Sequence, residues 1–237
     1  MHYAVSDING LWDKYEALLA QIDFGPDDFL YVLGNVLGRG PEGLRILHDL
    51  SLKPNAQVLL GNQEFAAMIC LPWLQEELSS DGTRDDVLAA RLQQVLSWKS
   101  DGGAAVMEEF TRLPLAGRQL VLDELSRLER TAEVSCGGNR FVLVHANLEN
   151  FAPGRPLGDY GIGELIQGKP DIGSRYFDDR YLVFGHTPTP LLYERERIGE
   201  EGTQIFRQDR LIGINCGCVY GGRLGCICLD TFAEYYV

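Results

Sequence analysis

The feature that most constrains the fold of this chain is a set of five short apolar runs. Each run is followed by a residue that can bind a metal ion or a phosphate. The residues that follow them are Asp7, Asn35, Asn62, His145 and His186. Short apolar runs bounded by glycine are typical of buried strands. Because ligands of open α/β sheets bind outside the carboxyl ends of their strands, the five residues are predicted to share one site. The runs cover residues 3–6, 29–33, 58–60, 141–144 and 181–184.

Between the first three runs the spacing of apolar residues is that of helices. Residues 10–22 carry apolar side chains on one helical face, and a second helix is predicted to begin at Pro41, where proline suits the first turn. Alternation of strand and helix predicts βαβ units. Strands are predicted to dominate again after Glu133, with a hairpin turn at Gly137-Gly138.

The middle of the chain is predicted to be helical from about residue 65 to residue 130. Breaks are expected near 79–82, near 101–103 and at Pro114. The polar residues of this region suit an exposed face. We therefore expect segment 76–130 to form a helical cap over one side of the site.

Composition predicts one domain covering residues 1–237. The chain is 45% hydrophobic and 23% charged, which is ordinary for a globular protein of 237 residues. The formal net charge of −13 argues against nucleic acid and anionic membrane surfaces as partners. No apolar run approaches the roughly 20 residues that cross a bilayer, and the N-terminal sequence lacks a signal-peptide pattern, so a cytoplasmic location is expected.

Four of the six cysteines are close together near the C-terminus. Two C-x-C pairs suit a zinc site, a disulfide pair, a redox or zinc sensor, or reduced cysteines that pack as small apolar residues. A hairpin turn at Gly221-Gly222 would send the two pairs to opposite faces of a ribbon, which favours the packing role. His2 and His48 have no motif around them and are expected at the surface. The four cysteines are Cys216, Cys218, Cys226 and Cys228.

The five run ends also carry motifs whose order resembles that of a known family. The motifs are Ser-Asp-Ile-Asn-Gly at 6–10, Gly-Asn-Val-Leu-Gly-Arg-Gly at 34–40, Gly-Asn-Gln-Glu at 61–64, Val-His-Ala at 144–146 and Gly-His-Thr-Pro at 185–188. Together they resemble the calcineurin-like metallophosphoesterases, most closely the bacterial phosphoprotein serine/threonine phosphatases, to which segment 217–224 is also similar. The resemblance implies an α/β fold in which a two-layer β-sandwich is flanked by helices.

The resemblance also implies two adjacent divalent metal ions between the strand ends. In the family the first motif supplies Asp and His to one metal, and the second motif supplies an Asp that bridges both. The Asn of the third motif and the two later histidines complete the second metal. The His of the third motif is the general acid, which the later Asp of the second motif orients, and the Arg of the second motif holds phosphate.

This chain departs from the family pattern at four positions. Asn9, Asn35, Gly38 and Gln63 stand, in that order, where the family has the metal-binding His, the bridging Asp, the orienting Asp and the general-acid His. All four differences remove a charge or a titratable group. The retained residues are Asp7, Asn62, His145 and His186 as candidate metal ligands and Arg39 as a candidate phosphate ligand.

These departures lead to specific expectations for metal and catalysis. The first metal position keeps Asp7 and two neutral amides, and it is expected to be empty. The second position, with Asn62, His145, His186 and Asn35 as a further donor, is expected to bind either no ion or one zinc, manganese or iron ion with reduced affinity. Gln63 has no proton to donate, and general acid catalysis is worth roughly a hundred- to ten-thousand-fold in rate.

Two functional hypotheses follow. The first is a pseudophosphatase that binds a phosphorylated or acidic ligand, such as a phosphoprotein or a phosphopeptide, or a protein partner, through the cleft or the cap. The alternative is an active but altered phosphoesterase that uses one ion at His145 and His186, with water as the proton donor. Simpler roles also stand beside these: Asp7 as a cap of the following helix or of its turn, Arg39 as the partner of a local carboxylate, and Glu64 as an acid of a first helical turn or a solvated residue.

Overall fold

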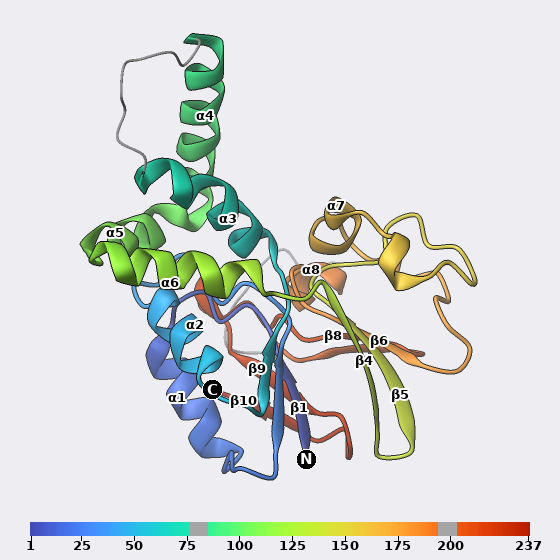
Figure 1. The fold of residues 1–237 in the computed structure, drawn as a ribbon. Helices are drawn as coiled ribbons and strands as arrows, with labels where there is room; N and C mark the ends of the chain where they lie inside the picture. Colours follow the sequence, from blue (N-terminus) through green and yellow to red (C-terminus); the bar gives the residue numbers. More distant parts are fainter. Residues whose placement is uncertain (76–84, 194–202) are drawn as a thin grey trace.

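The fold is described from a computed structural model for residues 1–75, 85–193 and 203–237. Two five-stranded sheets pack face to face, with strand orders β10-β9-β1-β2-β3 and β4-β5-β6-β8-β7. Helices cover the outer face of each sheet (Figure 1). The predicted α/β fold, a two-layer β-sandwich flanked by helices, is confirmed.

The first sheet is built on the two predicted βαβ units. Its parallel strands pair residue by residue, from His2 opposite Phe29 to Val32 opposite Val58. The last two strands of the chain complete this sheet in antiparallel directions. Its elements are β1 (His2–Val5), α1 (Trp12–Gln21), β2 (Phe29–Val32), α2 (Gly43–Ser51), β3 (Ala56–Val58), β9 (Gly225–Cys228) and β10 (Glu234–Tyr236).

The second sheet begins with the predicted hairpin. Gly137 and Gly138 connect its strands with φ of 54° and 76°, values that glycine adopts without strain. Three further strands and three short helical turns follow. The elements are β4 (Thr131–Cys136), β5 (Asn139–Val144), η2 (Leu157–Asp159), α7 (Ile162–Ile166), β6 (Tyr181–Phe184), α8 (Thr189–Leu192), β7 (Phe206–Gln208) and β8 (Leu211–Gly213).

A helical region separates the two sheets in the sequence. The chain breaks at Gly102, where φ is 111°, and at Pro114, as predicted. The predicted break at 79–82 and the start of the predicted cap, residues 76–84, lie outside the described residues. Figure 1 shows α4 pointing away from the sandwich. The elements are α3 (Asn62–Gln75), α4 (Asp85–Trp98), the π-turn η1 (Lys99–Gly103), α5 (Ala104–Arg112) and α6 (Leu115–Ser126).

Three apolar clusters hold these layers together. Leu33, Phe141 and Ile227 belong to the cluster between the two sheets. Tyr15 belongs to the cluster between the first sheet and its helices, and Tyr160 to the one behind the second sheet. Because apolar burial fixes both sheets against one another, the loops at their ends are held in defined positions.

The predicted hairpin at Gly221-Gly222 is wrong. Residues Cys218–Tyr220 form a short 3-10 turn, η3, and β9 pairs with β1 and β10 instead. Cys216 packs between the sheets, whereas Cys218, Cys226 and Cys228 pack on the helical side of the first sheet. Within the described chain, no three of these four cysteines bring their sulfur atoms together, and all six cysteines are free thiols. None of the described helices is long and apolar enough to span a bilayer.

Candidate active site

The five strand ends converge at one edge of the sandwich, as the sequence predicts. Asp7, Asn35 and His186 adopt left-handed backbone conformations with φ of 54°, 52° and 52°, so the chain turns sharply after each strand. Gly185 allows the loops of the two sheets to touch, because a Cβ there would lie 2.3 Å from the Ser6 hydroxyl. The candidate site is therefore shared between both sheets.

The carboxylate of Asp7 is buried and both of its oxygens accept hydrogen bonds. Asn35 donates its side-chain Nδ2–H to Oδ1 at 3.0 Å, and the His186 backbone N–H donates to Oδ2 at 2.9 Å. Burial raises the pKa of Asp7, while His186 and the hydrogen bonds oppose that shift. Helix α1 begins at Trp12 without a side-chain cap. The interpretation of Asp7 as the cap of this helix is therefore wrong.

Asn35 connects Asp7 to the start of α3. Its Oδ1 accepts the backbone N–H of Gln63 at 3.1 Å while its Nδ2 faces Asp7, so both partners define the orientation of the amide. An aspartate at this position would place a second carboxylate oxygen opposite Asp7, which is unfavourable without a cation. The neutral amide converts that repulsion into a hydrogen bond.

Asn9 and Gly38 depend on each other sterically. Asn9 donates its Nδ2–H to the backbone carbonyl of Asp7 at 2.8 Å, which folds its side chain back onto its own loop. A Cβ at Gly38 would lie 2.3 Å from the Oδ1 of Asn9. Asn9 therefore occupies the space into which a side chain at position 38 would begin, and the two departures from the family pattern form a matched pair.

His145 and Asn62 form the part of the site that best suits a cation. His145 is fully buried, and burial lowers its pKa to about 4, so its ring is neutral at pH 7. Its Nδ1–H, in the tautomer assigned from the hydrogen bond, donates to the Leu33 carbonyl at 2.6 Å. The lone pair of Nε2 then faces the Oδ1 of Asn62 at 3.0 Å. Two lone pairs at this distance suit neighbouring ligands of one ion.

His186 lies beside this pair. Its ring centroid is 5.1 Å from that of His145, with the rings inclined at 63°. Burial and the neighbouring His145 lower the pKa of His186, which also keeps this imidazole available as a neutral ligand. Within the described residues the donor atoms of Asp7, His145 and His186 do not all approach within 4.8 Å of one another. Asn62 and His145 are therefore the pair whose donor atoms face each other, with the His186 ring beside them, whereas both oxygens of Asp7 accept hydrogen bonds.

Gln63, in place of the general acid, joins the site to the helical region. The indole N–H of Trp98 donates to its Oε1 at 2.9 Å, and its Nε2–H donates to the backbone carbonyl of Asp101 at 2.9 Å. Both ends of the Gln63 amide are thus occupied by the residues that join α4 to α5. The Gln63 side chain therefore connects the third motif to the turn between α4 and α5.

Arg39 lies under the same turn and remains partly accessible. Its Nη2 is 3.9 Å from a carboxylate oxygen of Asp101, and its guanidinium lies 5.8 Å from the ring centroid of Tyr220. A Cβ at Gly102 would lie 3.2 Å from the Cγ of Arg39, so the turn approaches closely because it contains glycine. With 44% of its side chain exposed, Arg39 can meet a phosphate only in competition with Asp101.

Glu64 has a role that the sequence analysis missed. It is fully buried and accepts backbone N–H groups of Asn35, Leu37 and Gly61 at 2.8, 2.9 and 3.0 Å. Burial raises its pKa to about 7 although the hydrogen bonds oppose the shift. Glu64 lies in the first turn of α3, as one of the two expectations had it, but the interpretation as a solvated residue is wrong, since its buried carboxylate binds the second and third motif loops together. Its place in the third motif was the only available signal.

Comparisons with known proteins identify the family and the fold. No family model matches the chain. A protein named symmetrical bis(5'-nucleosyl)-tetraphosphatase from Vibrio parahaemolyticus is 33% identical over 250 residues, which cover 94% of this chain and 92% of that protein. Among solved structures, a putative diadenosine tetraphosphatase superposes with a TM-score of 0.67 at 20% identity, covering 100% of this chain and 92% of the other.

The expected resemblance to serine/threonine phosphatases holds for the fold. A protein serine/threonine phosphatase from Saccharomyces cerevisiae superposes with a TM-score of 0.60 at 12% identity, covering 95% of this chain and 71% of the other. The sequence relative quoted above carries the tetraphosphatase name instead. From the strand-end site, the shared fold and this near full-length similarity, the chain belongs to the symmetrical bis(5'-nucleosyl)-tetraphosphatase family of calcineurin-like metallophosphoesterases.

Proposed function

We propose that this protein is a pseudophosphatase, a family member that binds a phosphorylated ligand in the cleft but hydrolyses it very slowly or not at all. The observation that carries the proposal is the carboxylate of Asp7, both of whose oxygens accept N–H groups, from Asn35 and His186. An ion at the first position would have to displace these buried hydrogen bonds and would find only amide oxygens nearby. This donor set does not fit a second ion.

One ion fits the second position. Asn62, His145 and His186 are neutral ligands of the kind that zinc, manganese and iron accept, and the facing lone pairs of Asn62 and His145 support this assignment. Three neutral ligands without a carboxylate predict a reduced affinity. When bound, such an ion would polarise a phosphoryl oxygen.

Slow hydrolysis follows from the position of Gln63. An amide has no titratable proton, and this one is occupied by Trp98 and the turn at Asp101. Loss of a general acid costs about 10²- to 10⁴-fold in rate. In the proposed complex Arg39 orients a phosphate, while the neutral rings of His145 and His186 hold the ion.

The ligand that we propose is a nucleoside polyphosphate of the bis(5'-nucleosyl) tetraphosphate type. The relative from Vibrio parahaemolyticus is named for that class of molecule, and Arg39 offers a partly exposed guanidinium beside the candidate ion position. A phosphoprotein, a phosphopeptide or a protein partner is the second candidate ligand. We propose a cytoplasmic location, where nucleoside polyphosphates occur.

An active enzyme with a single ion is the alternative function. The neutral, buried imidazole of His145 and its approach to Asn62 favour it, because they retain two ligands of the second position. In this reading water supplies the proton that Gln63 cannot, and turnover depends on His145.

Elemental analysis and turnover on the same sample test these proposals. Protein purified without chelator is analysed for metal, and hydrolysis and calorimetric binding of diadenosine tetraphosphate are measured in parallel. We expect at most one ion per chain that His145→Ala removes, binding that Arg39→Ala weakens at least about tenfold, and no turnover above that of His145→Ala. Arg112→Ala, an exposed arginine on α5, is the matched control.

Two other results would decide against the pseudophosphatase. One ion per chain with slow turnover that His145→Ala abolishes supports the enzyme with a single ion. Two ions per chain that His145→Ala removes, with rapid turnover of the unmodified protein, would show that the hydrogen bonds on Asp7 do not block the first position, and the whole proposal would fail.

A further inference from the structure

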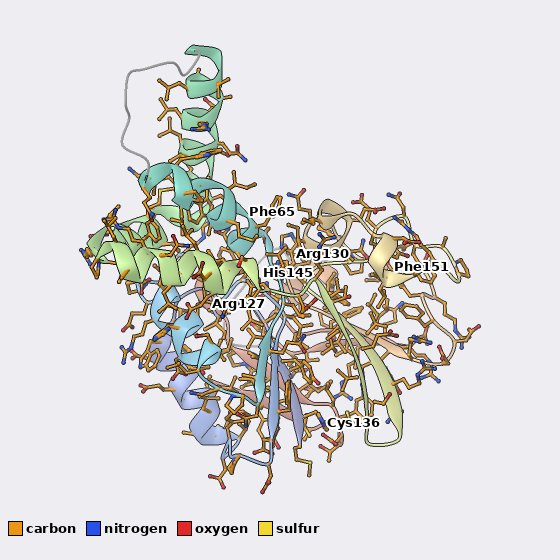
Figure 2. All side chains as sticks on the ribbon, in the orientation of Figure 1. Phe65, Arg127, Arg130, Cys136, His145 and Phe151 are labelled. Atoms are coloured by element: carbon orange, nitrogen blue, oxygen red, sulfur yellow. The ribbon has the colours of Figure 1, made fainter. Side chains whose placement is uncertain are left out.

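A second group of metal-binding side chains lies at the end of the sandwich opposite the cleft. His2 begins β1, Cys136 ends β4, and Asp230 follows the last residue of β9 by two positions. Asp7 and His145, by contrast, follow the opposite ends of strands β1 and β5. Figure 2 shows Cys136 and His145 at opposite ends of the second sheet. The two groups are therefore separate sites.

Backbone contacts hold the donors of the second group in place. The N–H of Leu229 donates to the carbonyl of His2 at 2.8 Å, and the amino group of Met1 pairs with Asp28 at 2.9 Å. The turn at Gly137 packs against Asp230, where a Cβ on Gly137 would lie 2.3 Å from the Asp230 carbonyl oxygen. Glycine thus lets the hairpin of one sheet approach the end of the other, which brings Cys136 to the group.

The donor atoms are close enough to share one ion. The Nδ1 of His2, the Sγ of Cys136 and a carboxylate oxygen of Asp230 all lie within 4.8 Å of one another, and this is the only such trio in the described ranges. The S–H of Cys228 also donates to the Oδ2 of Asp230 at 4.0 Å, but among the described residues Cys228 does not lie within 4.8 Å of all three donors. Imidazole, thiolate and carboxylate are the ligand types that zinc combines in proteins.

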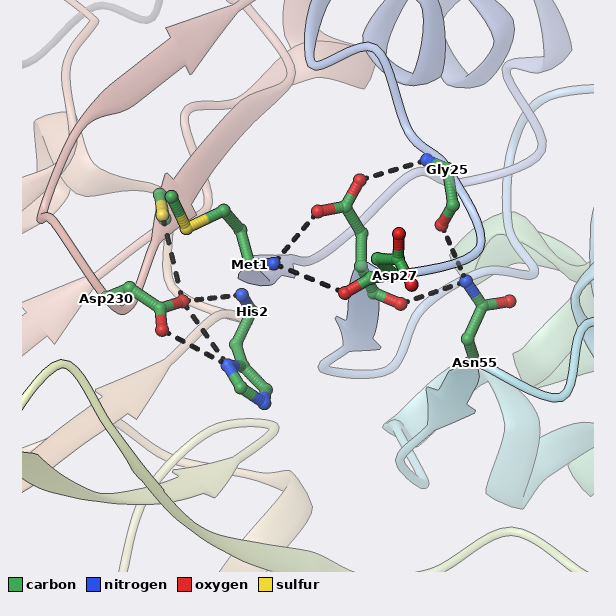
Figure 3. A network of polar contacts seen from close by, with 8 residues as sticks. Met1, His2, Gly25, Asp27, Asn55 and Asp230 are labelled. Atoms are coloured by element: carbon green, nitrogen blue, oxygen red, sulfur yellow. Dashed lines mark hydrogen bonds and ion pairs between the residues drawn. The ribbon is translucent and has the colours of Figure 1, made fainter.

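The spacing matches tetrahedral coordination. With bonds of about 2.0–2.1 Å to nitrogen and oxygen, neighbouring ligand atoms of a tetrahedral zinc site lie about 3.3 Å apart. The Nδ1 of His2 is 3.3 Å from each oxygen of Asp230 (Figure 3). This distance is longer than a usual charge-assisted hydrogen bond, and the Nδ1 of the ring is equally far from the two carboxylate oxygens.

A simple ion pair explains less of the arrangement. It accounts for His2 and Asp230, whose Oδ2 also accepts the His2 backbone N–H at 2.6 Å. The S–H of Cys228 donates a hydrogen bond to the same carboxylate at 4.0 Å. Neither contact explains why the Sγ of Cys136 also lies within 4.8 Å of both His2 and Asp230.

We propose that His2, Cys136 and Asp230 bind one divalent ion of the zinc class that clamps the two sheets together, with water as the fourth ligand. Binding forms the Cys136 metal–sulfur bond and releases the thiol proton to solvent. His2 and Asp230 have 37% and 21% of their side chains exposed, so an ion can enter from the surface. Because unfolding would separate the donors, the ion stabilises the folded chain.

Cobalt absorption tests this site separately from the cleft. Reduced protein without a histidine tag is stripped with a chelator and titrated with Co²⁺, and the near-ultraviolet absorption of cobalt–thiolate bonds is recorded. The proposed cleft ligands Asn62, His145 and His186 contain no sulfur, so this absorption reports only a cysteine site. We expect a band that saturates at one equivalent and that one equivalent of Zn²⁺ removes.

Variants identify the ligands. Cys136→Ser is expected to abolish the band and to weaken Zn²⁺ binding at least about tenfold, and Asp230→Asn is expected to weaken it similarly. His145→Ala in the cleft and Cys70→Ala under the helices are the matched controls and should keep the full band. Zn²⁺ should raise the unfolding temperature of the wild-type protein and leave that of Cys136→Ser unchanged.

Three outcomes would overturn the proposal. They are the absence of a thiolate band in folded, reduced protein, a band that Cys136→Ser leaves intact, and a Cys136–Cys228 disulfide in protein isolated under reducing conditions. Folding of each variant is checked by circular dichroism. Should Cys136→Ser fail to fold, Asp230→Asn and the wild-type titration still decide the result.

Discussion

The connection between Gln63 and the helical region makes a quantitative prediction. Gln63→Ala removes the acceptor of the Trp98 indole N–H and the donor to the Asp101 carbonyl, both at 2.9 Å. Each hydrogen bond contributes about 0.5–1.5 kcal/mol, and a buried donor left without a partner costs about 1–3 kcal/mol. Trp98 is only 4% exposed, so water cannot replace the lost acceptor. We expect the free energy of unfolding to fall by about 2–4 kcal/mol.

Urea unfolding in a double-mutant cycle isolates the pair. Trp98→Phe removes the indole N–H and keeps an aromatic ring in the same place. The double variant should be more stable than the sum of the two single changes predicts, by about 1–2 kcal/mol. Amide hydrogen exchange of residues 99–103 should accelerate in Gln63→Ala. Gln119→Ala on α6, where Gln119 bonds only the exposed Asp123, is the control and should change stability by less than about 0.5 kcal/mol.

A specific result would refute this reasoning. If the two single changes add to within about 0.5 kcal/mol, and if exchange in residues 99–103 is unaltered, Gln63 does not hold the turn. Its amide would then be free to contact a ligand, and the structural account of this substitution would have to be abandoned.

Two further predictions concern the loops and the buried titratable groups. Gly38→Asp should destabilise the protein by about 1–3 kcal/mol, because it displaces the Asn9 amide from the Asp7 carbonyl. Urea unfolding should show a smaller loss of stability when Gly38→Asp is made in an Asn9→Ala background, and equal losses would contradict the steric coupling. In chelated protein the pKa of His145 is lowered to about 4 from 6.5, so His145 binds fewer protons in the folded state than in the unfolded state. Its contribution to the free energy of unfolding therefore rises between about pH 4 and 6.5, by on the order of 3 kcal/mol. Glu64, with a pKa raised to about 7 from 4.5, binds more protons folded and acts with the opposite sign between about pH 4.5 and 7. The unfolding temperature should therefore change little with pH in the wild type, rise with pH in Glu64→Gln and fall with pH in His145→Asn. Parallel profiles of unfolding temperature against pH would show that these two groups do not titrate as assigned.

Local patterns in the sequence predicted the strands and their common edge. The runs before Asp7 and His145 are apolar because each strand is buried between layers, and a buried strand can be recognised in the sequence by its run of apolar residues. The glycine hairpin at 137–138 was predictable for a similar reason, since two successive residues with positive φ demand it. Features that depend on one segment's own chemistry can thus be read from the chain alone.

Features that depend on contacts between distant segments could not be predicted. Asp101 meets Gln63 across 38 positions, and no pattern near either residue indicates the contact. The position of Glu64 was misjudged because a carboxylate in a first helical turn is usually solvated, whereas here the second motif loop closes over it. Cys136 and Asp230 come together only because two hairpin ends meet, which strand patterns do not specify.

The four positions at which the chain departs from the expected family motifs contact one another or the same loops in the cleft. Without an ion, aspartates at positions 7 and 35 would repel each other as like charges. Asn35 instead donates a hydrogen bond to Asp7, Asn9 fills the space left open at Gly38, and Gln63 bonds Trp98 and Asp101. Asn9, Asn35 and Gln63 thus have their hydrogen-bonding groups occupied by neighbouring protein groups, and Gly38 leaves the room that Asn9 needs. This mutual fit without a metal ion is what the pseudophosphatase that we propose predicts.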